Sequence, residues 1–198
     1  MMYDYALMKG ELAKILSHKR YEHSLNVAQS AYELALKYDE NCEKAYVCGL
    51  LHDICKELPF KQQKQMALSS GYHLSFEEIC SKSLWHAVAG AYYAAKKYNI
   101  ADEDMLNAIR YHTIAREKMS RLEEIIYLAD LISADRKYKD VNRIRKLAFS
   151  DLQLAMREAL RFTLTNVSDN CVYLPLCSVQ AYNQYVFMCS DRNKEQEE

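Results

Sequence analysis

Glycine and proline are scarce in this chain, with four Gly and two Pro among 198 residues. Sheets joined by tight turns normally use both, because glycine supplies positive φ and proline presets the first turn position. Apolar residues instead recur at helical spacing, as at Val27, Ala31 and Leu34. The sequence therefore predicts an all-α protein, a single-domain helical bundle of roughly nine helices.

Capping residues and helix breakers divide the chain into helices. Asn41 is expected to cap one helix, and Ser75 with Glu78 has the pattern of a capping box. Pro59 is expected to mark the start of a helix that ends at Gly71. The other predicted helices cover residues 5–16, 19–38, 84–98, 102–112, 120–134, 148–166 and 179–189.

We divide the chain into an N-terminal helix (residues 1–18), a core (19–170) and a C-terminal part (171–198). The C-terminal part is predicted to hold a loop, a helix and a charged tail that frays from Ser190, packed on the core. The last helix carries Val179, Tyr182 and Val186. These residues either pack on the body or form part of a homodimer interface.

Charge and cysteine usage exclude several classes of protein. The 26 basic and 27 acidic residues give a net charge of -1, which argues against nucleic-acid partners and anionic membranes. The longest apolar runs are far shorter than the ~20 residues of a membrane span, and no secretory signal is visible. Seven cysteines lie scattered without a C-x-x-C pair. This pattern predicts reduced thiols in a cytoplasmic protein.

Histidines and aspartates fall on helix faces that should be buried. A single buried histidine is usually an ordinary core residue, and the whole set could be unrelated. However, burying Asp53 or Asp130 without a partner would cost several kcal/mol. One metal ion would remove that cost for the group, so we predict a metal site. Imidazole and carboxylate ligands suit iron, manganese, zinc or cobalt. The set is His23, His52, Asp53, His86, His112 and Asp130.

Asp53 directly follows His52, so one helix end offers a nitrogen and a carboxylate able to bridge two ions. Two ions about 3.5–4 Å apart can generate hydroxide near neutral pH and neutralise phosphoryl charge. The predicted chemistry is hydrolysis of phosphate esters or anhydrides.

The order H…HD…H…D is met by His23, His52-Asp53, His86 or His112, and Asp130, and it resembles the HD superfamily of metal-dependent phosphohydrolases. Local stretches resemble one branch, the YqeK-type bacterial symmetrical diadenosine tetraphosphate hydrolases. The resemblance covers residues 20–183. Its motifs are RYEHS (20–24), LLHDICK (50–56), WHAVAGA (85–91), AIRYHT (108–113), MS (119–120), IIYLAD (125–130) and AYN (181–183).

This resemblance implies hydrolysis of diadenosine tetraphosphate, and of related dinucleoside polyphosphates, to two ADP. Iron is the expected cofactor, with manganese, cobalt or zinc as alternatives. The first ion would be held by His23, His52, Asp53 and Asp130. His86 and His112 would either complete a second ion site or contact the phosphate chain, and the catalytic residues would be Asp53, His86 and His112.

The resemblance also places residues around a dinucleoside polyphosphate or an ADP-like nucleotide. Arg20, Lys56, Thr113 and Arg136 match positions that face phosphates. The other residues expected to bind the substrate are His23, Asp53, His86, His112 and Asp130. Arginine offers a planar fork to phosphate and lysine a point charge, although each could be an ordinary surface cation. The loop that would close over the nucleoside, or serve only as a connector, is Tyr173, Leu174, Pro175, Leu176, Cys177 and Ser178.

Two stretches depart from the family pattern and put the substrate preference in doubt. After Asp130 the family usually has Ile-Glu-Pro-x-Arg, whereas this chain has Ile-Ser-Ala-Asp-Arg, so Ser133 replaces a carboxylate. After His112-Thr113 the usual Thr-Gly is Ile114-Ala115. The expected mechanism is attack of metal-bound hydroxide on phosphorus, in line with departing ADP, while His86 or His112 protonates the leaving oxygen. The alternatives are another HD-type nucleotide phosphohydrolase, or a nucleotide sensor that keeps the metal without turnover.

Overall fold

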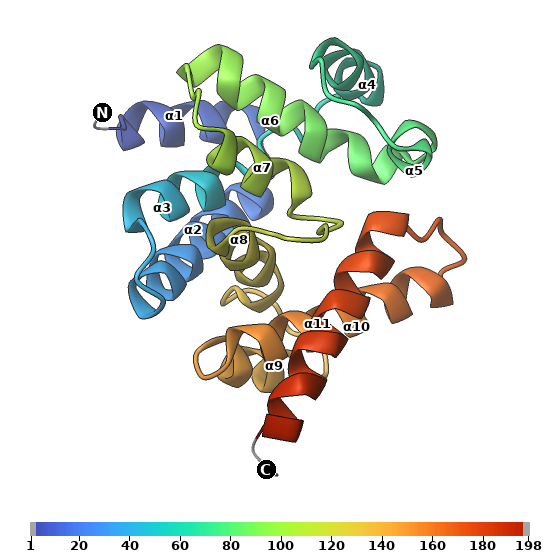
Figure 1. The fold of residues 1–198 in the computed structure, drawn as a ribbon. Coiled ribbons are helices and arrows are strands. Elements are labelled where there is room, and N and C mark those ends of the chain that lie inside the picture. Colours follow the sequence, from blue (N-terminus) through green and yellow to red (C-terminus); the bar gives the residue numbers. More distant parts are fainter. Residues whose placement is uncertain (1–2, 196–198) are drawn as a thin grey trace.

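The computed structural model describes residues 3–195 and shows eleven α-helices and no strand in that range (Figure 1). This confirms the all-α prediction. The helices are α1 (Tyr5–Ile15), α2 (His18–Lys37), α3 (Cys42–Leu51), α4 (Phe60–Ser69), α5 (Phe76–Cys80), α6 (Trp85–Tyr98), α7 (Glu103–Tyr111), α8 (Arg121–Ile132), α9 (Val141–Ala148), α10 (Leu152–Asp169) and α11 (Leu176–Glu195), with a 3-10 turn η1 (Lys82–Leu84) before α6.

The predicted caps are present. The side chain of Asn41 accepts a hydrogen bond from the Lys44 amide at 3.0 Å, at the start of α3. At α5, the Ser75 hydroxyl and the Glu78 carboxylate each accept from the other residue's amide, which completes the capping box. These contacts satisfy amide groups that a helix N-terminus leaves without a partner.

Three helix boundaries differ from the prediction. The helix expected over 148–166 is α10 and begins only at Leu152, while the helix before it, α9 (Val141–Ala148), was not predicted; the amides of Ser150 and Asp151 both bond to the Leu147 carbonyl and end α9 there. Asp151 then caps α10 by accepting from the Leu154 amide. Helix α11 begins at Leu176, inside the predicted loop, and continues to Glu195 rather than fraying from Ser190. Residues 196–198 of the predicted tail lie outside the described residues.

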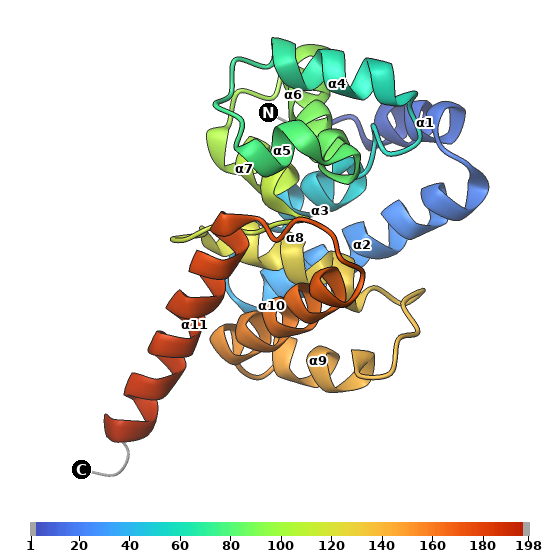
Figure 2. The same cartoon turned by 90° about the vertical axis from the view of Figure 1, so that its right-hand side faces the viewer.

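Helices α2, α3 and α8 lie between the two ends of the bundle, with α3 at one side of the molecule in Figure 1 (Figures 1 and 2). Helices α4 to α6 lie toward one end and α9 to α11 toward the other. Contact between α2 and α3 is close because Gly49 has no side chain: a Cβ there would lie 2.8 Å from the Ala28 Cα. This approach brings the face of α2 that carries His23 against the end of α3.

The last helix packs on the body. Ala181 and Tyr185 are buried, and the Tyr185 hydroxyl donates to Glu124 Oε1 of α8 at 2.6 Å. This agrees with the first of the two roles predicted for the helix, and a homodimer interface stays a prediction. Within residues 3–195, no helix combines the length and apolar character needed to cross a membrane.

Candidate metal centre

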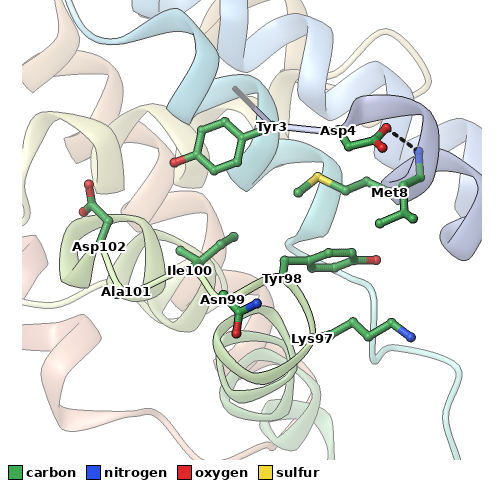
Figure 3. A pocket seen from close by; sticks show the side chains of 10 residues that line it. Tyr3, Asp4, Met8, Lys97, Tyr98, Asn99, Ile100, Ala101 and Asp102 are labelled. Carbon is green, nitrogen blue, oxygen red and sulfur yellow. Dashed lines mark hydrogen bonds between the residues drawn. The ribbon is translucent and has the colours of Figure 1, made fainter. Parts of the chain in front are cut away.

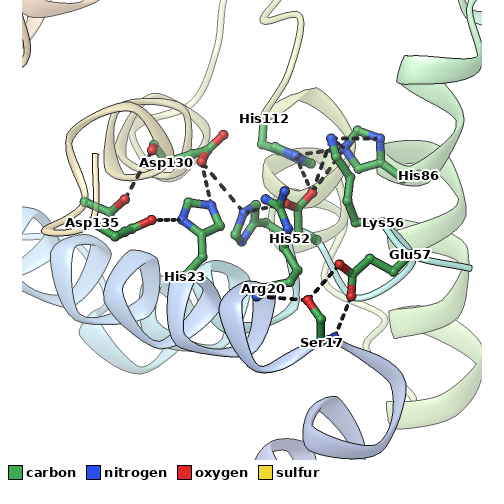
Figure 4. A network of polar contacts seen from close by, with 12 residues as sticks. Ser17, Arg20, His23, His52, Lys56, Glu57, His86, His112, Asp130 and Asp135 are labelled. Carbon is green, nitrogen blue, oxygen red and sulfur yellow. Dashed lines mark hydrogen bonds and ion pairs between the residues drawn. The ribbon is translucent and has the colours of Figure 1, made fainter. Parts of the chain in front are cut away.

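Five elements bring the predicted histidines and aspartates into one cluster (Figure 4). His23 comes from α2, His52 and Asp53 from the end of α3, and Asp130 from α8. Single ligand atoms of His23, His52 and Asp130 lie within 4.8 Å of one another. The same is true of His52, Asp53 and the residue that ends α7, His112. His52 therefore belongs to both groups.

Backbone carbonyls fix the rings of two histidines. Nδ1 of His52 donates to the Gly49 carbonyl at 2.7 Å, and Nδ1 of His112 donates to the Ile109 carbonyl at 2.7 Å. A carbonyl can only accept, so Nδ1 carries the proton in both rings. The Nε2 atom of each neutral ring is left with a lone pair for a cation.

His23 lies between two carboxylates. Its Nδ1 is 2.8 Å from Asp135 Oδ2, and its Nε2 is 3.0 Å from Asp130 Oδ1. A metal ion on the Nε2 side would replace the proton shared with Asp130, while Asp135 would keep the ring in place. This is the usual carboxylate support of a metal-binding histidine.

Two buried atoms at the centre of the cluster test whether a metal fits. His52 is fully buried and Asp53 is 2% exposed, and neither His52 Nε2 nor Asp53 Oδ1 has a hydrogen-bond partner among residues 3–195. Buried polar atoms without partners are rare because each costs free energy. Both atoms are metal-ligand types, and an imidazole and carboxylate set suits a divalent ion. The residues therefore fit a divalent metal ion.

Both central aspartates are held ionised. Burial opposes ionisation of Asp53, but the electrostatic interaction with His52 and the contacts of the His112 and His86 rings together outweigh it, so the Asp53 pKa lies well below its usual range. Burial likewise opposes ionisation of Asp130, yet the hydrogen bond from His23 and the electrostatic interactions with His52 and Arg136 together lower the Asp130 pKa more than burial raises it. Carboxylates kept charged are the forms that bind cations.

Cationic side chains border the aspartates. Arg20 Nη1 lies 2.7 Å from Asp53 Oδ2, and the Arg136 guanidinium bonds to both the Asp130 carboxylate and its backbone oxygen. Lys56 Nζ lies 3.0 Å from His86 Nε2 and 3.8 Å from Asp53 Oδ1. The three cations that were expected to face phosphates thus lie beside the aspartates, and their contact with phosphate stays a prediction.

His86 stands apart from the other histidines in its electrostatics. Its Nε2 lies 3.2 Å from Asp53 Oδ1 and 3.3 Å from His112 Nε2. Burial and the Lys56 charge lower the His86 pKa to about 4, although the nearby Asp53 carboxylate opposes them. His86 is therefore a neutral ring at pH 7, with Lys56 as its cationic neighbour. Burial also lowers the Lys56 pKa, against the pull of Asp53.

The segment after His112 explains one departure from the family pattern. Ala115 is fully buried and has φ +57°, the left-handed region that glycine occupies without strain. The glycine usual at this position therefore has a conformational reason, and this chain keeps the turn with alanine. Just before it, the Thr113 hydroxyl oxygen is buried with no hydrogen-bond partner in the described part of the chain.

The predicted nucleoside loop lies to one side of the cluster. Tyr173 packs edge-on against Phe76 of α5, with 5.9 Å between ring centroids. The Ser178 hydroxyl donates to the Ile114 carbonyl, two residues after His112. Pro175 is buried, whereas Leu174 and Leu176 are exposed. The structure thus brings the loop against the segment that follows His112, and nucleoside contact stays a prediction.

The comparisons bear directly on this geometry. The family model described as HD domain matches residues 20–135, which span more than half of the chain and include His23, the His52-Asp53 pair and Asp130. The chain belongs to the HD domain family.

Related HD proteins match over most of their length. A protein of Bacillus subtilis named symmetrical bis(5'-nucleosyl)-tetraphosphatase is 36% identical over 75% of this chain and 80% of its own length. A protein with the same name from Halalkalibacterium halodurans is 38% identical over 76% and 80%. A crystal structure from Clostridium acetobutylicum is described as a predicted HD superfamily hydrolase involved in NAD metabolism. It matches 95% of this chain and 100% of its own, at 39% identity and a TM-score of 0.90.

Sequence reasoning missed one residue of this HD site. Asp135 received no role from the sequence, because it only lies in the stretch that departs from the family pattern. In the structure, its carboxylate contacts the His23 ring directly. Its position five residues after Asp130, just past the end of α8, was the available signal. The sequence could not show that the chain turns back there, with the Arg136 amide bonded to the Ser133 carbonyl at 3.0 Å.

A cavity of about 380 Å³ lies away from these histidines, between α1 and the α6–α7 connection (Figure 3). Tyr3, Met8, Tyr98 and Asp102 are among the residues that line it, and none of its lining residues belongs to the metal centre. This cavity is thus not the place where the chemistry-bearing residues gather.

Proposed function

We propose that this protein hydrolyses diadenosine tetraphosphate, and related dinucleoside polyphosphates, to two ADP with a divalent metal ion. The observation that carries the proposal is the aspartate and histidine cluster bordered by Arg20, Lys56 and Arg136. A polyphosphate brings several negative charges, and these cations would oppose them. The names of the relatives from Bacillus and Halalkalibacterium support the same substrate class.

His23, His52, Asp53 and Asp130 would hold the ion, with iron first and manganese, cobalt or zinc as alternatives. When bound, the ion would activate water and neutralise charge on phosphoryl oxygens. We propose a single ion, because the Lys56 ammonium already lies 3.0 Å from His86 Nε2 and 3.8 Å from Asp53 Oδ1. Lys56 would supply the second positive charge that an additional ion would otherwise bring.

The remaining side chains would bind and orient the phosphate chain. Arg20 would offer two parallel donors to phosphate oxygens, and Lys56 a point charge. The buried Thr113 hydroxyl, which has no partner in residues 3–195, would donate to a phosphate oxygen. His112 would carry a proton at Nε2 toward the leaving oxygen, since its Nδ1 is held by the Ile109 carbonyl.

We also propose that the protein acts in the cytoplasm. The seven cysteines are all free thiols, and reduced thiols are typical of reducing compartments.

Product analysis tests the proposal. The protein, purified without oxygen and loaded with Fe(II) or Mn(II), is expected to convert diadenosine tetraphosphate to ADP alone. Appearance of AMP and ATP would reject the symmetrical cut, and absence of turnover with Fe(II) and Mn(II) would reject the activity. His52→Asn should abolish turnover, while Asp140→Asn, an exposed aspartate outside the cluster, should retain it. A panel of other nucleotides then separates this activity from other HD-type phosphohydrolases.

A further inference from the structure

Phe60, which is exposed, and Trp85, which is buried, form an aromatic pair that lies close along the chain to Lys56 and His86. Phe60 begins α4 and is 54% exposed, although it is a large apolar side chain. Its ring packs edge-on against Trp85, with 6.3 Å between centroids and 81° between planes. Trp85 is the one tryptophan of the chain, and it immediately precedes His86.

Two lysines surround this pair. Lys82 Nζ lies 5.7 Å from the centroid of the Phe60 ring, and Lys64 Nζ lies 5.3 Å from that of Trp85. Both lysines are exposed. An exposed aromatic face bordered by ammonium groups matches the two parts of a nucleotide, because the base stacks on the ring and the phosphates meet the cations.

The chain fixes this pair close to the metal centre. Phe60 follows Lys56 by four residues, so their Cα atoms are at most about 15 Å apart, at 3.8 Å per residue. Trp85 adjoins His86, whose Nε2 lies 3.0 Å from Lys56 Nζ. Each ring thus belongs to a residue that lies within four positions of a predicted phosphate ligand, Lys56 for Phe60 and His86 for Trp85.

A second edge-on pair involves the predicted nucleoside loop. It joins Tyr173 of that loop to Phe76 of α5, at 5.9 Å. Helices α4 and α5 lie at the same end of the molecule, with the α10–α11 connection facing α5 (Figure 2). A dinucleoside tetraphosphate carries two nucleosides, and the loop accounts for only one of them.

We propose that Phe60 and Trp85, with Lys82 and Lys64, form the subsite for the second nucleoside of the substrate. This inference rests on the proposed function, since it assigns the half of the dinucleotide that the Tyr173–Ser178 loop does not bind. The base stacks on the exposed face of Phe60, and the lysines attract the adjoining phosphates. Such a subsite favours dinucleotides over mononucleotides without taking part in the chemical step.

Phe60→Ala tests the subsite. Loss of one stacking partner should raise KM for diadenosine tetraphosphate about tenfold, within the range of base–aromatic stacking, and leave kcat unchanged. Phe60→Tyr keeps the ring and should keep KM near the wild-type value. The matched control is Phe149→Ala, which removes an exposed phenylalanine beyond α9 and should change neither constant.

Adenosine 5'-tetraphosphate separates this role from general damage to the site. It has the phosphates but only one nucleoside, so its inhibition constant against diadenosine tetraphosphate should be the same for wild type and Phe60→Ala. An equal loss of affinity for both compounds would overturn the subsite, as would an unchanged KM for the dinucleotide. Wild-type protein with no turnover would instead overturn the proposed function.

Trp85 fluorescence gives a second readout that needs no turnover. In metal-free protein, diadenosine tetraphosphate should change the emission of the single tryptophan with saturation, and Phe60→Ala should weaken the apparent affinity. Adenosine 5'-tetraphosphate should produce a much smaller change. An emission that responds equally to both compounds would contradict stacking at this pair.

Discussion

At the scale of single residues, the His23 ring is held by a carboxylate, that of Asp135, whereas the His52 and His112 rings are held by backbone carbonyls. His52 and His112 donate Nδ1–H to carbonyls, whereas His23 faces a carboxylate at 2.8 Å. A carboxylate fixes the ring and makes Nε2 a more basic ligand than a carbonyl does. The chain therefore places a charged group behind one ligand, in the stretch that departs from the family pattern.

Asp135→Asn is expected to weaken metal binding by about 10- to 100-fold, because an amide accepts a weaker hydrogen bond from Nδ1–H. Titration of metal-free protein with Mn(II), followed by the loss of the free-ion EPR signal, measures the dissociation constant directly. Asp140→Asn is the control, since Asp140 is an exposed aspartate in the same α8–α9 connection. Equal affinities in wild type and Asp135→Asn would show that the contact does not support the metal.

His86 makes the stability of metal-free protein depend on pH. Its pKa is about 4 in the folded protein against 6.5 for an unperturbed histidine, so the unfolded chain binds more protons between these pH values. Stability from this residue is therefore complete above about pH 6.5 and is lost as pH falls toward 4, by about 3 kcal/mol. Urea unfolding at a series of pH values measures the free energy of unfolding of wild type and of His86→Gln. On acidification, the wild type should lose about 3 kcal/mol more than the variant. Equal losses in the two proteins would contradict the assignment.

At the scale of helices, the α2–α3 contact depends on one missing side chain. A Cβ on Gly49 would lie 2.8 Å from the Ala28 Cα, so backbone must move to accept it. Gly49→Ala should destabilise the protein by about 1–3 kcal/mol through overpacking, despite alanine's better helix propensity. Gly10→Ala, in open space on α1, should instead stabilise by roughly 0.5–1 kcal/mol. Urea unfolding measures both, and the same sign for both variants would refute the packing argument.

Local signals explain why much of the fold was predictable. Asn41, Ser75 and Ser120 cap helices through their own side chains, and those contacts depend only on residues three positions away. Helix α9 was not predicted, and the turn at Ser150 that separates it from α10 holds neither glycine nor proline to mark it. The start of α11 was missed because Pro175 reads as a loop residue, although the amides of Ser178 and Val179 bond to its carbonyl.

The sequence predicted which residues gather in the site, but it did not predict the contacts that hold their side chains in place. His23, His52 and Asp130 were expected together because burial of carboxylates demands a cation, and they do converge. Contacts such as Asp135 with His23 depend on how the α8–α9 connection turns back. That geometry is tertiary, and periodicity in the sequence carries no information about it.

At the scale of the whole molecule, the metal centre joins segments far apart in the chain. Its ligand candidates come from α2, the end of α3 and α8, between the α4–α6 end and the α9–α11 end. Without a cation, the folded state must hold His52 Nε2 and Asp53 Oδ1 buried with no hydrogen-bond partner in residues 3–195. A bound ion would satisfy these atoms only in the folded chain, so metal binding and global stability should be coupled.

Metal removal should therefore lower the melting temperature of the whole domain in one transition. At a free-ion concentration 100 times the dissociation constant, binding adds about 2.7 kcal/mol, which corresponds to roughly 5–10 °C for a chain of this size. Calorimetry of wild type with EDTA, and again after adding Mn(II), measures the shift. His52→Asn, which lacks the central ligand, should melt at the same temperature in both conditions. A wild-type melting temperature that ignores Mn(II) would mean that the cluster binds no ion, and a shift retained in His52→Asn would place the ion elsewhere.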